Sequence, residues 1–146
     1  MKAKMAILFV FILFAGILFW PQNLSDEEAI HQSLNHAVAG LSERDLSLVM
    51  EAISDEYLDE DRFNKKTLKG ILFQQFQRKQ SIIIQLSNKK LSLTPPTAYI
   101  EAQADVLAGS LLDRNGNNVS FDVHIAFQKE DDQWRIVSHK RERILP

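Results

Sequence analysis

Residues 98–127, AYIEAQADVLAGSLLDRNGNNVSFDVHIAF, decide the fold of this chain. From Ala98 to Val106, apolar residues at every second position alternate with polar ones, which is the pattern of a strand with one buried face. Asn115-Gly116 is the strongest short signal of a β-hairpin. The return segment, Val119–Phe127, alternates in the same way. The stretch therefore predicts two antiparallel strands that bury one common face.

Strand signals continue on both sides of this hairpin. Ser81–Leu86 is rich in β-branched residues, and Leu91 and Leu93 either continue that strand or pair with it through a turn. Pro95-Pro96 ends it, because proline cannot donate to a sheet ladder. Trp134–His139 forms the last predicted strand. The second half of the chain is therefore expected to be an antiparallel meander.

The residues before the strands predict helices. Ser25-Asp-Glu-Glu28 is a capping box that begins the first helix. Ser42, with Asp45 three residues later, begins a short second one, and Asn64 caps a third. The third helix is expected to turn these side chains inward: Leu68, Ile71, Leu72 and Phe76. Helices followed by strands indicate an α+β fold, with three N-terminal helices packed on one face of the sheet.

An apolar run precedes the helices. Met5–Trp20, MAILFVFILFAGILFW, follows Lys2 and Lys4. As a helix it measures about 24 Å, short of a ~30 Å hydrocarbon core, although Lys4 extends it by snorkelling. We expect a single transmembrane helix, so that residues 1–24 are the anchor and linker and residues 25–146 are the domain.

The alternative is a cleaved signal peptide, which ends at a small-x-small site. Here the bulky Ile17–Trp20 follows Ala15-Gly16, which favours an uncleaved anchor. Cationic flanks stay in the cytoplasm, so Lys2 and Lys4 lie inside. The predicted location is the bacterial inner membrane, with a single pass and the C-terminal domain in the periplasm. If the anchor is cleaved, the domain is secreted.

Composition narrows the function classes. The net charge is −2, and the chain lacks the basic excess of nucleic-acid-binding proteins, so no nucleic acid partner is predicted. It has no Cys, which excludes a disulfide framework and a lipid-anchored cysteine. No dinucleotide fingerprint, phosphate loop or nucleophile elbow occurs, and no cofactor is predicted. Asp113-Arg-Asn-Gly-Asn117 resembles the start of a calcium loop, but position 118, where that loop requires Gly, is Asn, so no metal is predicted.

Three local sequences in this order of elements carry a family resemblance. They are Ser42-Glu-Arg-Asp-Leu46, Asp55-Glu-Tyr-Leu-Asp59, and the last turn and strand, Phe127–Ile136, FQKEDDQWRI. Together they resemble the nuclear-transport-factor-2-like (NTF2-like) superfamily, which includes ketosteroid-isomerase-like and SnoaL-like domains, over residues 26–142. The resemblance implies a sheet curved around the helices as a cone, with a pocket at its open end and often a dimer through the outer face of the sheet.

The resemblance implies that an enzyme of this kind has an acid, a Tyr or a His inside the cone. The inward strand positions are apolar by parity, which leaves three polar candidates at the mouth, Tyr57, Asp59 and His36, of which Tyr57 and Asp59 are the catalytic candidates. A packed ring and a solvated turn residue are the more common roles of such residues. A small hydrophobic ligand is expected to lie against six residues: Ile30, Leu34, Tyr57, Phe73, Phe76 and Phe121.

The outer face of the sheet is the predicted interface with a protein partner or a second copy. Its candidate residues are Tyr99, Glu101, Gln103, His124, Arg135 and Val137. His124 and His139 are expected to face outward on neighbouring strands. Three functions remain open: a tethered, non-catalytic binding or assembly module, a carrier of a small hydrophobic ligand, and an isomerase or dehydratase-type enzyme. The uncleaved anchor and the apolar cone favour the first, whose layout resembles the periplasmic scaffold subunit of type IV secretion systems.

Overall fold

The computed structural model describes residues 23–107 and 119–145. These residues form three helices and one four-stranded antiparallel sheet, which confirms the α+β prediction. The elements are α2 (Asp26–Glu43), α3 (Leu46–Ala52), α4 (Lys65–Gln77), β1 (Ile83–Thr94), β2 (Thr97–Leu107), β3 (Val119–Glu130) and β4 (Gln133–Arg143).

The predicted anchor, Met5–Trp20, lies outside the described residues, and so the boundary at residue 24 stays a prediction. Within residues 23–107 and 119–145, no helix combines the length and apolarity that crossing a membrane requires.

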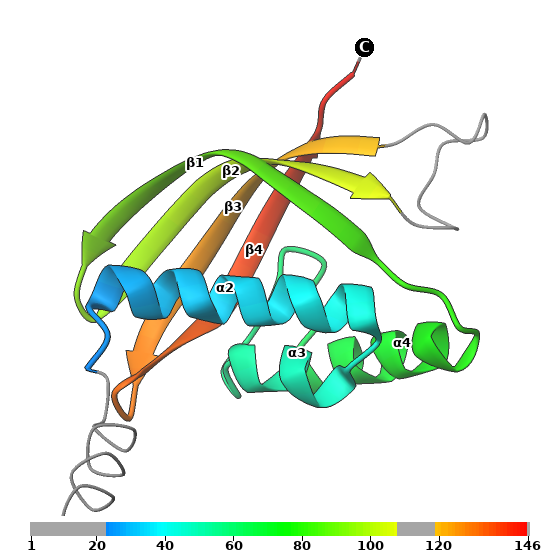
Figure 1. Cartoon of the computed structure of the whole chain (residues 1–146), viewed down its shortest axis with the longest axis horizontal. Coiled ribbons are helices and arrows are strands. Elements are labelled where there is room, and N and C mark those ends of the chain that lie inside the picture. The colour runs from blue at the N-terminus through cyan, green and yellow to red at the C-terminus, as the bar shows by residue number, and fades with distance from the viewer. Residues whose placement is uncertain (1–22, 108–118, 146) are drawn as a thin grey trace, which may run out of the picture.

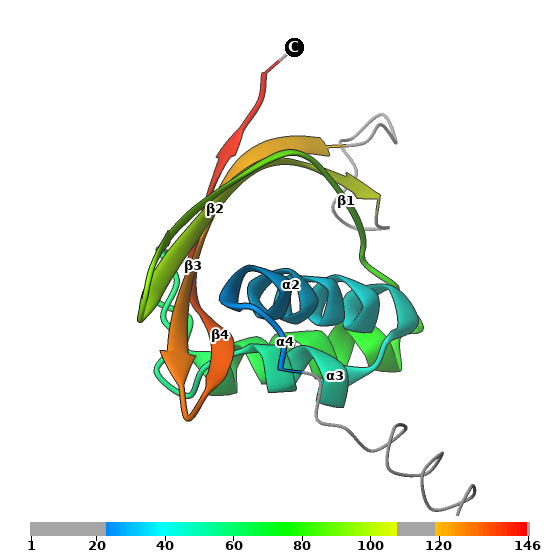
Figure 2. The same cartoon turned by 60° about the vertical axis from the view of Figure 1, so that its left-hand side comes forward.

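The strands lie in the order β1-β2-β3-β4, and each is antiparallel to the next. The sheet arches over α2, which crosses its concave side (Figure 1). Turned by 60°, the molecule shows α3 and α4 beneath α2, on the side away from the sheet (Figure 2). The curved, cone-like arrangement implied by the family resemblance is therefore present.

The core follows the alternation in the sequence. Every second residue of β2 is buried: Ala98, Ile100, Ala102, Ala104 and Val106. The intervening side chains face solvent on the convex side. The buried positions pack against the apolar stripe of α2, formed by Ile30, Leu34 and Ala37. Because a strand alternates with period two, one sequence pattern determines both faces of the sheet.

Side-chain caps fix where the helices begin. Ser25 and Glu28 form the predicted capping box, and Asn64 accepts from the Thr67 amide at 2.9 Å. The prediction that the second helix begins at Ser42 is wrong. Ser42 continues α2, the chain reverses at left-handed Arg44 (φ 59°), and the Asp45 carboxylate caps α3.

Two further expectations are resolved by packing. β1 is one continuous strand with a bulge between Ser87 and Lys90, so the two apolar segments are halves of one strand. Ile71 does not turn inward: it is exposed, whereas its neighbour Leu72 is 4% exposed. The inward side of α4 therefore centres on Leu72, with Leu68 and Phe76 packed against the core.

Candidate functional site

An apolar cavity of about 200 Å³ lies between the three helices and the concave face of the sheet. Tyr57 and His139 supply the polar side-chain groups among the described residues that line it. The other lining residues are Leu34, Ala37, Val38, Leu41, Val49, Ile53, Leu68, Leu72, Ile84, Leu86, Ala104, Val123, Ile125 and Ile136. The cavity therefore has an apolar lining with a single polar position, formed by Tyr57 and His139.

Tyr57 reaches the cavity from the segment between α3 and α4. That segment runs along the edge of β4, where the Ser54 amide donates to the Ile136 carbonyl at 2.9 Å and the Leu58 amide donates to the Val137 carbonyl at 3.0 Å. These two bonds hold the intervening Tyr57, which is 3% exposed. A loop residue is thereby positioned as firmly as a strand residue.

The Tyr57 hydroxyl lies 2.6 Å from Nδ1 of His139. Their rings stack, with centroids 6.2 Å apart and planes inclined by 18°. When Nδ1 is unprotonated, the hydroxyl donates to it. The pair therefore satisfies each other's polar atoms at the cavity wall.

The inward direction of His139 corrects the sequence-based expectation. The register of β3 and β4 shifts between Ala126 and Phe127, because Phe127 pairs with Ile136 while Ala126 pairs with Ser138. One extra residue in β4 reverses its alternation, so that His139 turns toward the cavity. Bulges re-aim side chains in this way.

His124 stays on the convex face, where its Nδ1 lies 3.6 Å from a Glu101 carboxylate oxygen. The outward direction predicted for His124 therefore agrees with the structure, whereas the outward direction predicted for His139 is wrong. Parity counted from Trp134 cannot reveal the reversal, since the sequence at Val137 shows no Gly or other bulge signal.

The electrostatics of the pair favour two neutral groups. Burial raises the pKa of Tyr57 above its usual value, and the nearby charge of Asp59 adds to the shift. Burial lowers the pKa of His139, partly opposed by the charge of Asp59. Both shifts move the pKa values further from pH 7, whereas a general acid or base works best with a pKa near the working pH. The pair suits hydrogen bonding better than proton transfer.

Asp59 is buried close to the pair but is not among the residues lining the cavity. Its Oδ1 accepts from the Phe63 amide at 2.8 Å, which closes the turn before α4. His36 is exposed on α2 and faces a different surface hollow. Of the three polar residues predicted at the mouth, the structure brings Tyr57 to the cavity.

The predicted pocket residues divide into two groups. Leu34 and Tyr57 line the cavity, while Ile30 is fully buried beside it and Phe121 packs against the core. Phe73 and Phe76 instead border an outer groove, and Phe73 is 53% exposed. The difference follows from the rotation of α4, which puts Leu72 inward.

The fold is shared with solved structures. An NTF2-like protein of Cytophaga hutchinsonii matches with a TM-score of 0.68 at 10% identity, over 83% of this chain and 100% of that chain. This chain has the NTF2-like fold. A protein of cystatin-like fold from Nostoc punctiforme (TM-score 0.63, 14% identity, 83% and 94% covered) and a putative aromatic ring hydroxylase from Novosphingobium aromaticivorans (0.64, 11%, 81% and 88%) are also similar. No family model and no curated protein matches the sequence.

The convex face of the NTF2-like sheet carries four of the predicted interface residues, which are Tyr99, Glu101, Gln103 and His124. Tyr99 is 55% exposed, and Glu101 and Gln103 follow it on the same side of β2. In register with them lie residues of β3, so that Glu101 pairs with His124. Arg135 is half-buried and instead lines a surface hollow on the helix side, together with Glu51. Its Nη2 donates to the Gln133 side chain at 2.7 Å.

Val137 lies at the β4 bulge and is half-buried. A role of this convex face in binding stays a prediction.

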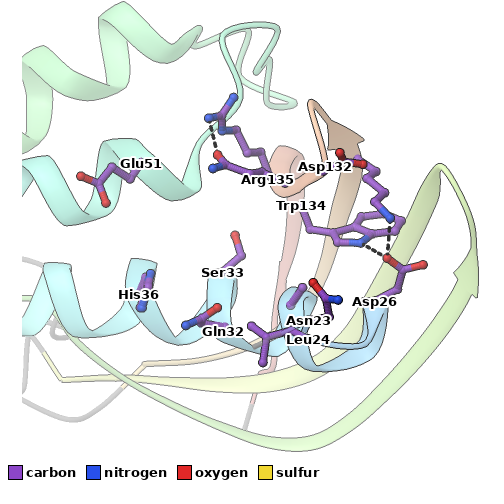
Figure 3. A pocket seen from close by; sticks show the side chains of 13 residues that line it. Asn23, Leu24, Asp26, Gln32, Ser33, His36, Glu51, Asp132, Trp134 and Arg135 are labelled. Atoms are coloured by element: carbon purple, nitrogen blue, oxygen red, sulfur yellow. Dashed lines mark hydrogen bonds and ion pairs between the residues drawn. The ribbon is translucent and has the colours of Figure 1, made fainter. Parts of the chain in front are cut away.

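A larger hollow of about 630 Å³ lies on the surface of the NTF2-like domain (Figure 3). At its edge, Asp26 Oδ1 accepts from Lys129 Nζ at 2.9 Å and from Trp134 Nε1 at 2.8 Å. These bonds tie the start of α2 to the β3–β4 hairpin. The Ser33 hydroxyl lines the same hollow, buried and without a hydrogen-bond partner among the described residues. Because these polar groups at the edge of the hollow already serve a structural contact, the inner cavity is the better candidate site.

Proposed function

We propose that this chain is a membrane-tethered, non-catalytic binding domain on the periplasmic side that holds a small apolar ligand in its inner cavity. The observation that carries the proposal is the cavity itself, apolar except at Tyr57 and His139. An apolar cavity of about 150 Å³ binds benzene, and so about 200 Å³ suits a single ring or a short branched chain. The uncharged pair of Tyr57 and His139 provides a hydrogen-bond partner for one polar group of the ligand.

The tether rests on Met5–Trp20 and on the short linker that follows it. A capping box begins α2 at Ser25, a few residues after Trp20, so the domain works close to the bilayer. An apolar ligand concentrates in or near a membrane, which makes a tethered binding domain more useful than a diffusing one.

An enzyme of the isomerase or dehydratase type would need Tyr57 and Asp59 as an acid and a base. Their environment supports this less well. The shift in the pKa of Tyr57 makes it a weaker acid, and Asp59 already accepts a backbone hydrogen bond.

The test uses the full chain in detergent, with benzene and phenol as probes. Ligand at ten times its Kd stabilises the folded state by about 1.4 kcal/mol, a rise of several degrees in Tm. The variant Ala104→Leu fills the cavity and is expected to abolish this shift. The matched control Ala126→Leu, placed opposite Tyr99 in the register of the sheet, is expected to keep it. Equal Tm shifts in both variants, or none in the unaltered protein, would contradict the proposal.

A second candidate is self-association or partner binding through the convex face, favoured by the exposed Tyr99 beside charges of both signs. Light scattering of the full chain tests it. The double variant Tyr99→Ala, Glu101→Lys is expected to lower the measured mass, while the comparably exposed control Phe73→Ala is not. The convex face would be ruled out as an interface by two results together. The unaltered protein would be monomeric, and its complexes in cells would persist in the double variant.

A further inference from the structure

We propose that the outer face of α4 rests on an anionic bilayer surface, in the same membrane that holds Met5–Trp20. The inference rests on the proposed tether and adds how the domain is oriented on the membrane. The outer face is defined by Lys66, Lys69, Phe73 and Gln77, which project from one side of α4.

The charge of this segment is of one sign. Residues 65–79, KKTLKGILFQQFQRK, contain five basic residues and no acidic one. Lys65 is paired with Asp55 at 2.7 Å, whereas Lys66 and Lys69 are exposed. Arg78 and Lys79 continue the positive charge beyond the end of the helix. Basic residues around exposed apolar ones characterise helices that lie in the membrane interface.

The apolar part of the contact is Phe73. It is 53% exposed and, together with Phe76 and Leu46, borders an outer groove that two basic residues and one acidic residue also line: Arg44, Lys79 and Glu43. α4 has a single fully buried side chain, Leu72, so the helix contributes little to the core for its length. An exposed aromatic ring beside cationic side chains fits the boundary between headgroups and acyl chains.

The acidic residues before α4 do not cancel this charge. The Asp61 carboxylate lies 3.6 Å from the guanidinium of Arg141 on β4, and Asp59 is turned inward to the Phe63 amide. Part of the negative charge of this loop is therefore directed toward the sheet and the turn. The contact is centred on the C-terminal half of the helix.

The described chain begins on the helical side of the domain, which is the side proposed to face the membrane. The blue segment that leads into α2 is at the level of α3 and α4, away from the crest of the sheet, in both views (Figures 1 and 2). Residues 21–24 span at most about 14 Å. A domain held on so short a linker presents its helical side, and not its sheet, to the bilayer.

The experiment places the full chain in nanodiscs that contain anionic lipid and a spin-labelled quencher. The sequence has no Cys, so a single cysteine carries an environment-sensitive fluorophore. At Gln77→Cys, beside Phe73, strong quenching is expected. At the control Ser92→Cys, exposed on the sheet, little is expected. Reversing Lys66 and Lys69 to Glu is expected to weaken the contact by roughly tenfold or more, since each basic residue near an anionic surface contributes roughly fivefold in affinity.

Co-elution with the nanodisc separates the two proposals. A chain that leaves the nanodisc contradicts the tether. A chain that stays, with the probe at Gln77 quenched no more than the probe at Ser92, contradicts the orientation alone. If the protein in detergent has the mass of a dimer and the probe at Gln77 is shielded from solvent, the outer face of α4 contacts a second copy of the chain. That result would also overturn the inference.

Discussion

At the scale of single residues, the Tyr57–His139 pair is the most informative feature. The two residues lie 82 positions apart, and each satisfies the other's polar atom at an otherwise apolar wall. Their burial makes the charged form of either one costly. The stability of the domain is therefore coupled to pH through this pair.

The first prediction concerns acid. The lowered pKa of His139 means that the unfolded chain binds a proton more readily than the folded one, so stability is present above pH 6.5 and is lost as the pH falls below it. The slope reaches about 1.4 kcal/mol per pH unit for one group. Urea unfolding from pH 8 to 4.5 measures it. His139→Gln is expected to flatten the slope, and the exposed control His124→Gln to leave it unchanged. The reverse result would show that His139 titrates freely in the folded state.

The second prediction concerns Tyr57 in base. Because burial raises its pKa, stability is present below pH 10 and is lost as the pH rises above it. Tyr57→Phe is expected to remove that loss and, at pH 7, to cost about 1 kcal/mol for the missing hydrogen bond. The exposed Tyr99→Phe serves as the control. An alkaline loss that persists unchanged in Tyr57→Phe would contradict the assignment.

At the scale of elements, the crossing of α2 and α3 depends on a glycine. A Cβ placed on Gly40 would lie 2.6 Å from Val49 Cγ2 and 2.9 Å from both the Asp45 carbonyl oxygen and the Val49 amide nitrogen. Backbone atoms cannot move aside as side chains do, so the two helices approach this closely only where no side chain intervenes. Gly70 on α4 has no neighbour within 4 Å of such a Cβ.

The third prediction compares the two glycines. Gly40→Ala is expected to destabilise the fold by about 1–3 kcal/mol through overpacking. Gly70→Ala is expected to stabilise it by about 0.5–1 kcal/mol, because Ala has the higher helix propensity and meets no obstacle. Denaturant unfolding measures both. Equal changes in the two variants would show that α3 is not packed against α2 at this point.

At the scale of the whole molecule, three helices and a bent sheet border a partly open space that they do not fill. Packed protein interiors leave few voids larger than a water molecule, so a retained apolar cavity indicates room for a ligand. The same arrangement leaves α3 and α4 on the side of α2 that faces away from the sheet, and the convex face of the sheet in solvent (Figure 2). Cavity, outer helix and sheet face are thus three separate surfaces.

The fourth prediction uses this cavity. Leu34→Ala enlarges it and is expected to cost about 2–5 kcal/mol, part of which saturating benzene restores. Leu145→Ala, at a side chain 77% exposed, is expected to change stability by less than about 0.5 kcal/mol. Thermal unfolding with and without benzene measures both. A loss in Leu34→Ala that benzene leaves untouched would indicate that the site collapses instead of remaining open.

Local chemistry made much of the fold predictable. The capping box at Ser25, the cap at Asn64 and the alternation of β2 depend on neighbouring residues, so the sequence by itself determined the helices, the strands and the buried face of the sheet. The start of α3 was misplaced because Ser42 and Asp45 both carry cap-forming side chains, and the choice depended on the left-handed turn at Arg44.

The site was decided by the tertiary structure. The bulge at Val137 arises between strands and is completed by the Leu58 amide from a distant segment. That bulge turns His139 inward to meet Tyr57, and the rotation of α4 moves Phe73 outward. Register and helix rotation depend on contacts between remote parts of the chain, and hydrophobic periodicity does not encode them. The sequence therefore determined which faces are apolar, and only the packed molecule decided which residues meet in the cavity.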